Sequence, residues 1–198
     1  MKHESLALYC GSSAGKNPAY TEEARKFGRL CAKRGITIYY GGGSIGLMGA
    51  AAEASLEEGG KVIGVAPRFF KEGAVLATNL TEMIIVDSMS ERKQLLEEKA
   101  DAFVVFPGGY GTMDELFEMI TDAQLGLHSK PVAVYNYLGF YDHLLKQLDK
   151  FMEEGFLRPF HHSLLVTAND LDELFRKLEN YENSNDRSWL DKIKHQTK

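Results

Sequence analysis

Three glycines between an apolar run and an acid form the strongest chemical signal in this chain. Residues 103–106 are apolar, and Pro107, the glycines and Glu115 follow them. Glycines where a strand meets a helix let the backbone approach a ligand closely, and the positive end of the helix favours an anion, most often a phosphate. The pattern predicts chemistry on a phosphorylated small molecule. The residues expected to bind it are Gly108, Gly109, Tyr110, Gly111 and Thr112.

A second motif supplies cations about twenty residues earlier, where Met89, Arg92 and Lys93 open a predicted helix. The carboxyl ends of parallel strands share one edge of a sheet, so Arg92 and Glu115 can converge on one phosphate-sized cavity. Each residue also has a plainer interpretation. Arg92 alone is typical of a solvated surface, and Thr112-x-x-Glu115 has the spacing of a capping box. Lys93 is either a second phosphate contact or a surface lysine.

Two further glycine loops follow the first and second predicted strands, and they add Gly11, Ser12, Gly43 and Ser44 to the expected substrate contacts. The string at 41–46 matches the dinucleotide fingerprint, but that fingerprint follows the first strand and needs an acid at the end of the next one. Here the next strand ends in Ala-Pro-Arg at 66–68. An NAD-binding enzyme is therefore a minor alternative. The glycines at 41–46 serve either tight packing or the shape of the pocket.

Elements that would position these motifs alternate along the chain, with apolar runs separated by helical patterns. Continuous Val, Ile and Leu runs predict a parallel sheet covered on both faces. The expected fold is a Rossmann-like, doubly wound α/β domain of about seven strands over residues 1–181, followed by a polar tail at 182–198. The predicted strands are 6–10, 36–40, 62–66, 83–86, 102–106, 132–135 and 164–167, and the predicted helices are 18–34, 45–59, 89–99, 112–126, 140–154 and 170–181.

Composition narrows the class of protein. The 198 residues carry a net charge of −5 and are 44% apolar, with no basic run that would suggest a nucleic-acid partner. No apolar stretch is long enough to predict a membrane span, so we expect a cytoplasmic protein. Cys10 and Cys31 do not have the spacing of a zinc site or a disulfide framework, and we expect no metal.

Together, the motif at 107–115 and the motif at 89–93 closely resemble the Lonely Guy family of cytokinin riboside 5′-monophosphate phosphoribohydrolases. Bacterial members of that family were often mislabelled lysine decarboxylases. The resemblance covers about residues 5–180. It implies a homodimer without a cofactor that cleaves the N-glycosidic bond of N6-modified adenosine 5′-monophosphates, and often of AMP, with Arg92 and Glu115 as the catalytic residues. A decarboxylase would instead need pyridoxal phosphate on a lysine, an acid at its ring nitrogen and a larger protein.

Cleavage of that bond builds positive charge on the ribose, which a carboxylate beside it stabilises. Glu115 would take this role and handle the attacking water. Arg92 would either help the base depart or clamp the phosphate, and the sequence leaves both roles open. It also leaves open the preferred N6 substituent, a role in hormone production or nucleotide salvage, and an oligomer larger than a dimer. A non-catalytic carrier of nucleotides or molybdenum cofactor on the same fold is the main alternative.

Overall fold

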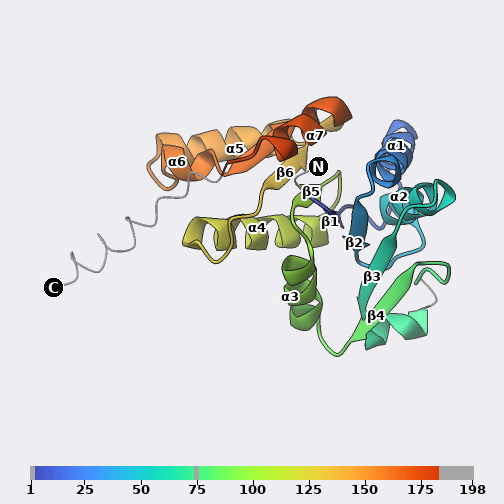
Figure 1. The fold of residues 1–198 in the computed structure, drawn as a ribbon. Helices are drawn as coiled ribbons and strands as arrows, with labels where there is room; N and C mark the ends of the chain where they lie inside the picture. The colour runs from blue at the N-terminus through green and yellow to red at the C-terminus, as the bar shows by residue number, and fades with distance from the viewer. Residues whose placement is uncertain (1–2, 74–75, 183–198) are drawn as a thin grey trace.

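The computed structural model describes residues 3–73 and 76–182, which form a seven-stranded parallel sheet in the order β4-β3-β2-β1-β5-β6-β7 (Figure 1). All seven predicted strands are confirmed, as is the doubly wound α/β class. The predicted tail lies outside the described residues from 183 onward. The strands are β1 (Ser5–Tyr9), β2 (Thr37–Tyr40), β3 (Val62–Pro67), β4 (Glu82–Val86), β5 (Phe103–Val105), β6 (Val132–Tyr135) and β7 (Leu165–Ala168).

All six predicted helices are also present, and the described residues add one short helix and two 3-10 turns. Ser88-x-x-Glu91 and Asp170-x-x-Glu173 have the spacing of helix caps, and both caps form, because the side chains of Ser88 and Asp170 accept hydrogen bonds from the amides of Glu91 and Glu173. The helices are α1 (Ala19–Lys33), α2 (Gly46–Glu57), α3 (Met89–Lys99), α4 (Tyr110–Leu125), α5 (Asp142–Glu153), α6 (Pro159–His162) and α7 (Leu171–Glu179), and the turns are η1 (Arg68–Gly73) and η2 (Tyr137–Gly139).

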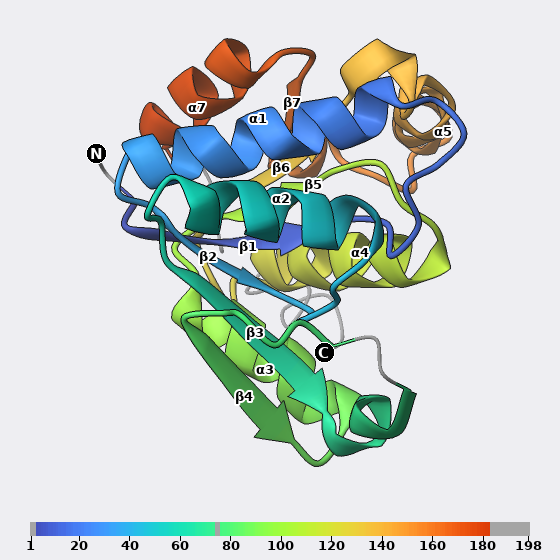
Figure 2. The same ribbon diagram turned by 90° about the vertical axis from the view of Figure 1, so that its right-hand side faces the viewer.

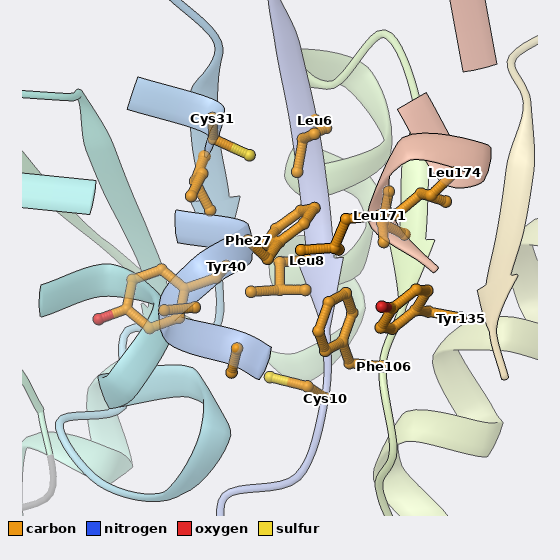
Figure 3. Packing of buried hydrophobic residues seen from close by; sticks show 14 of the residues in the cluster. Leu6, Leu8, Cys10, Phe27, Cys31, Tyr40, Phe106, Tyr135, Leu171 and Leu174 are labelled. Atoms are coloured by element: carbon orange, nitrogen blue, oxygen red, sulfur yellow. The ribbon is translucent and has the colours of Figure 1, made fainter. Parts of the chain in front are cut away.

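Side chains of the central strand alternate between two apolar clusters, one on each face of the sheet. Leu6 and Leu8 belong to the cluster covered by α1, α2 and α7, which lie together in Figure 2. Ala7 and Tyr9 belong to the opposite cluster, under α3 and α4. Figure 3 shows the first cluster, where the Phe106 ring lies 4.6 Å from the Tyr135 ring, centroid to centroid. Burial on both faces explains why the strands read as continuous apolar runs.

The strand order reverses between β1 and β5, and this reversal places the site. Loops that leave the carboxyl ends of two such strands diverge, and a crevice opens between them. β4 lies at the far edge of the sheet, separated from β5 by β3, β2 and β1. Helix α3 therefore has to cross one face of the sheet to connect β4 with β5. This crossing, rather than adjacent strand ends, carries Arg92 towards Glu115.

Candidate functional site

A cavity of about 480 Å³ opens at this crevice, between the loops after β1, β2 and β5 and the first turns of α3 and α4. Its size suits a nucleotide-sized ligand. Most of the residues predicted from the sequence line it, whereas Ser44, Lys93 and Gly108 are not part of the lining. The predicted residues in the lining are Gly11, Ser12, Gly43, Met89, Arg92, Gly109, Tyr110, Gly111, Thr112 and Glu115.

Arg92 and Glu115 form a buried ion pair at the cavity wall. Nη2 of Arg92 lies 2.7 Å from Oε1 of Glu115, and their side chains are 7% and 5% exposed. Nε of Arg92 donates a second hydrogen bond, 3.2 Å long, to the carbonyl of Val65 in β3. Contacts at both ends of the guanidinium fix its plane, so the two predicted catalytic residues are brought together and held rigidly.

Glu115 is not a capping residue, and this part of the sequence interpretation was wrong. Helix α4 begins at Tyr110, two residues before Thr112, and its N-cap is Gly109, which has no side chain to accept a hydrogen bond. Thr112 therefore lies inside the first turn, and Glu115 lies beyond it, facing Arg92. The capping-box interpretation is replaced by a buried carboxylate that faces a cavity.

Burial dominates the electrostatics of Glu115. Desolvation raises the pKa of this carboxyl above its usual range, and the charge and hydrogen bond of Arg92 act against that rise. Burial, followed by the charge of Glu115, also raises the pKa of the Cys10 thiol in the cavity floor. The raised pKa favours the neutral thiol of Cys10 over the thiolate, which is the reactive form.

Gly41 makes room for the arginine, a role that its position in a fingerprint-like string did not indicate. A Cβ atom at position 41 would lie 2.6 Å from Nη2 of Arg92, much closer than atoms can approach. Any larger residue there would displace the guanidinium from the position in which it pairs with Glu115. At least one glycine of the 41–46 loop therefore serves the ion pair.

The three glycines of the 108–111 loop divide into two roles. A Cβ at Gly108 would lie 2.1 Å from Oγ1 of Thr112, so this glycine is required by packing. At Gly109 and Gly111 a Cβ would meet no atom within 4 Å, and both residues line the cavity. Amides of the first turn of a helix have no partner within the helix, and they form an anion site at its positive end. Gly109 and Gly111 thus keep space open beside the start of α4.

Lys93 follows Arg92 in sequence, but its side chain forms ion pairs between α3 and α4 and does not enter the cavity. Its ammonium group pairs with Asp114 at 3.2 Å and also with Glu118, and these contacts connect α3 to α4. The hydrogen bond to Glu118 is the largest cause of the raised pKa of Lys93. The structure does not bring Lys93 to the cavity, and the interpretation as a second phosphate contact is replaced by one as a link between helices.

Apolar side chains line one part of the cavity, and none of them was predicted from the sequence as a site residue. Ile45, Met48, Phe70 and Leu76 form this apolar wall. Phe70 and Leu76 come from the connection between β3 and β4, which has no regular helical pattern. That connection is attached to the glycine loop, because the amide of Ala77 donates to the Gly42 carbonyl at 2.9 Å. Cys10, Gly41 and Asp114 complete the unpredicted part of the lining.

Across residues 3–73 and 76–182, no group of three or more His, Cys, Asp and Glu side chains is arranged to hold a metal ion. Of the described residues that line the cavity, Arg92 carries the only basic side chain. The described lining thus contains no lysine that could form a Schiff base with pyridoxal phosphate. None of the described helices is both long and apolar enough to cross a bilayer.

Comparison with known proteins identifies close relatives. A family model described as possible lysine decarboxylase matches residues 48–178. A cytokinin riboside 5′-monophosphate phosphoribohydrolase of Arabidopsis thaliana is 42% identical over 181 residues, which cover 91% of this chain and 83% of that protein. A probable enzyme of the same name from Oryza sativa subsp. japonica is 45% identical over 176 residues, or 89% of this chain and 78% of the relative.

Solved structures with the same fold are more distant in sequence. A molybdenum cofactor binding protein from Rippkaea orientalis superposes with a TM-score of 0.68 at 19% identity, covering 90% of this chain and 97% of that one. The molybdenum cofactor carrier protein of Chlamydomonas reinhardtii gives a TM-score of 0.66 at 19% identity, covering 88% of this chain and 95% of that one. At this level of identity the likeness shows a shared fold alone.

Proposed function

The chain belongs to the Lonely Guy family of cytokinin riboside 5′-monophosphate phosphoribohydrolases, and we propose that it hydrolyses the N-glycosidic bond of adenosine 5′-monophosphates, including N6-modified ones. The products are the free base and ribose 5-phosphate. The observation that carries this proposal is the buried Arg92–Glu115 pair beside the glycines at the start of α4, all in one cavity. A cytoplasmic enzyme acting on free nucleotides fits this chemistry.

The start of α4 and the apolar wall suggest how the nucleotide lies in the cavity. Its phosphate would bind at the amides of residues 109–112, where the helix end favours an anion. Its base would lie against the apolar wall that includes Met48 and Phe70. The ribose then lies between them, beside Glu115. In this orientation an apolar N6 substituent would extend towards Ile45, which is 56% exposed, and towards Phe70.

Glu115 acts on the reacting carbon in this arrangement. As the bond between the ribose C1′ and the base nitrogen breaks, positive charge builds on the ribose, and an adjacent carboxylate stabilises it. The same carboxylate takes a proton from the water whose oxygen bonds to C1′, and the base leaves with the electron pair of the broken bond. Arg92 holds the carboxylate in place, and its remaining N–H groups serve either the phosphate or the departing base.

The phosphate requirement is the first test of this proposal. Charge-assisted hydrogen bonds to a phosphate are each worth about 1.5–3 kcal/mol, so the loss of two should lower kcat/KM by about a hundredfold or more. Incubation of the protein with AMP and with adenosine, followed by chromatography for free adenine, measures this ratio. Comparable turnover of the two compounds contradicts the proposal. AMP binding without adenine release would instead favour the carrier alternative.

The variant Gly109→Ala tests the proposed phosphate site by changing the protein instead of the substrate. A Cβ there would meet no protein atom within 4 Å, so the fold should tolerate it. The methyl group would occupy space at the proposed phosphate site, and KM for AMP should rise about tenfold or more. Gly108→Ala is the contrasting variant, because its Cβ would collide with Thr112 and should lower the melting temperature instead.

We also infer that two copies pair through the outer face of α4. Tyr110 is 97% exposed and Phe117 is 41% exposed on this helix, whose first turn lines the cavity. Exposed aromatic side chains in a row are typical of protein interfaces, and two-fold dimers are the commonest assemblies. Light scattering should give twice the chain mass of 22.1 kDa. Phe117→Lys should shift the mass to that of one chain, and a single-chain mass for the wild type would contradict the dimer.

A further inference from the structure

The backbone carbonyl just before the glycine loop has an unusual partner. The ladder of β5 ends at Val105, so the carbonyl of Phe106 lies beyond the sheet in a fully buried position. It accepts a hydrogen bond, 2.7 Å long, from the phenol of Tyr141, whose residue is 3% exposed. A buried carbonyl that lacks a hydrogen-bond donor lowers the stability of the fold. Replacing this phenol with an apolar group should therefore be destabilising.

Tyr141 is delivered to that carbonyl by a tightly held connection between β6 and α5. Oδ1 of Asn136 accepts a 2.7 Å hydrogen bond from the Tyr141 amide, and Nδ2 of Asn136 donates to Asp142 at 2.8 Å. Within the connection, Leu138 has a φ of +55°, which is rare for a residue with a side chain. Such strain persists only where the surroundings hold the chain in place, and it is commonly found near functional sites.

Pro107, the residue after Phe106, is held by the loop after β1. The carbonyl of Pro107 accepts a 2.9 Å hydrogen bond from the Gly11 amide, and the carbonyl of Gly11 accepts one from the amide of Leu47 at the start of α2. Phe106 and Pro107 are thus fixed by α5 on one side and by the loops after β1 and β2 on the other. Gly108 and Gly109 follow directly, and they have no side chains that could hold the backbone in place.

We propose that Tyr141 is a positioning residue for the glycine loop: its hydrogen bond to the Phe106 carbonyl fixes where the loop starts, and so sets the affinity for the phosphate group of the substrate. Tyr141 does not line the cavity and acts through the backbone. Burial raises the pKa of the Tyr141 phenol, so the phenol keeps its proton and donates it to the Phe106 carbonyl. The role in substrate affinity rests on the proposed function.

Tyr141→Phe removes the donor and keeps the ring. Without the phenol, the entry to the loop should become more mobile, and the amides of residues 109–112 should lose their alignment before the phosphate binds. We expect KM for AMP to rise about tenfold with kcat changed less than about threefold, because binding of a remote group is lost rather than chemistry. The inhibition constant of ribose 5-phosphate should rise by the same factor.

Tyr135→Phe is the matched control. Its phenol is also buried and donates a 2.6 Å hydrogen bond, but to Glu23 of α1 rather than to the glycine loop. Tyr135 does not line the cavity, although its ring lies beside that of Phe106 (Figure 3). Both variants should melt at a lower temperature than the wild type, and only Tyr141→Phe should change KM.

The experiment compares wild type and both variants by melting temperature, AMP kinetics, ribose 5-phosphate binding by calorimetry, and hydrogen exchange of a peptide spanning residues 106–112. The proposal predicts faster exchange of that peptide and weaker ribose 5-phosphate binding in Tyr141→Phe alone. Equal exchange and equal binding in the two variants overturn it. Failure of the wild type to release adenine overturns the proposed function instead, and the exchange measurement still decides the role of Tyr141.

Discussion

The guanidinium of Arg92 lies 2.7 Å from the carboxylate of Glu115, with both side chains almost fully buried at the wall of a nucleotide-sized cavity. Two ions are expensive to bury, and a buried pair often contributes little to stability relative to apolar residues of the same size. The pair is therefore better explained by what it does than by what it stabilises. It holds a carboxylate ready beside the position proposed for the ribose.

Arg92→Ala should damage both the fold and the activity. Removing one partner of a buried ion pair leaves the other charge uncompensated, which typically costs about 3–5 kcal/mol. A rise in KM would assign Arg92 to the phosphate, whereas a fall in kcat at constant KM would assign it to the departing base. Denaturant unfolding and AMP kinetics on one preparation measure both effects.

The matched control is Arg68→Ala. The ion pair between Arg68 and Asp87 has side chains that are 73% and 82% exposed, and pairs of this kind contribute little. The unfolding free energy and turnover of the Arg68→Ala protein should stay close to those of the wild type. An Arg92→Ala protein as stable and as active as Arg68→Ala would contradict both the structural and the functional interpretation of the pair.

Gly41→Ala should disturb the site through a single methyl group. The added Cβ would lie 2.6 Å from Nη2 of Arg92, so the guanidinium must leave its present position beside Glu115. We expect kcat to fall at least tenfold, because a displaced guanidinium no longer holds the Glu115 carboxylate in position beside the ribose. Gly43→Ala is a useful comparison for stability, since its Cβ would lie at an ordinary 3.5 Å from Met48. Wild-type turnover of Gly41→Ala would show that the arginine position is unimportant.

The pH dependence should report on Glu115. Burial raises the pKa of its carboxyl above 4.5, the ordinary value for this group. The ionised form stabilises the ribose charge, so kcat/KM should fall as the pH drops through this raised pKa. The acid limb of the profile should therefore lie at higher pH than an exposed glutamate would give. A profile that stays flat down to pH 4.5 would show that no raised carboxylate pKa controls the reaction.

Sequence patterns predicted the strands, because burial on both faces of a parallel sheet demands continuous apolar runs such as Val132–Tyr135. The caps at Ser88 and Asp170 also follow from a local signal, because each capping side chain and the amide that it accepts from lie three residues apart. The capping box at Thr112 failed because glycines at 109 and 111 allow the helix to begin earlier, at Tyr110. Local spacing cannot tell a cap from a carboxylate one turn later that faces a cavity.

The convergence of Arg92 and Glu115 was predicted, but other contacts between distant segments were not. Glycine is needed at position 41 because Arg92, on helix α3, lies against it. No residue near Gly41 in the sequence indicates this contact. Phe70 and Leu76 come from the connection between β3 and β4, where the sequence pattern predicts no element, although Phe70 lies in the 3-10 turn η1. Lys93 illustrates the reverse problem: its place beside Arg92 suggested the phosphate, but helical geometry turns it towards Asp114 and Glu118.

Glu115→Gln tests the proposed chemistry most directly, with Glu118→Gln as its control one turn further along α4. Glu118 pairs with Lys93 and does not line the cavity. Melting temperature, AMP affinity and adenine release are measured on each purified protein. Glutamine has the shape of glutamate and can still accept a hydrogen bond from Arg92, so Glu115→Gln should fold and bind AMP. Its turnover should fall by about 10²–10⁴-fold or more, while Glu118→Gln stays near wild type. A folded Glu115→Gln protein that keeps more than about a tenth of wild-type turnover would remove Glu115 from the reaction.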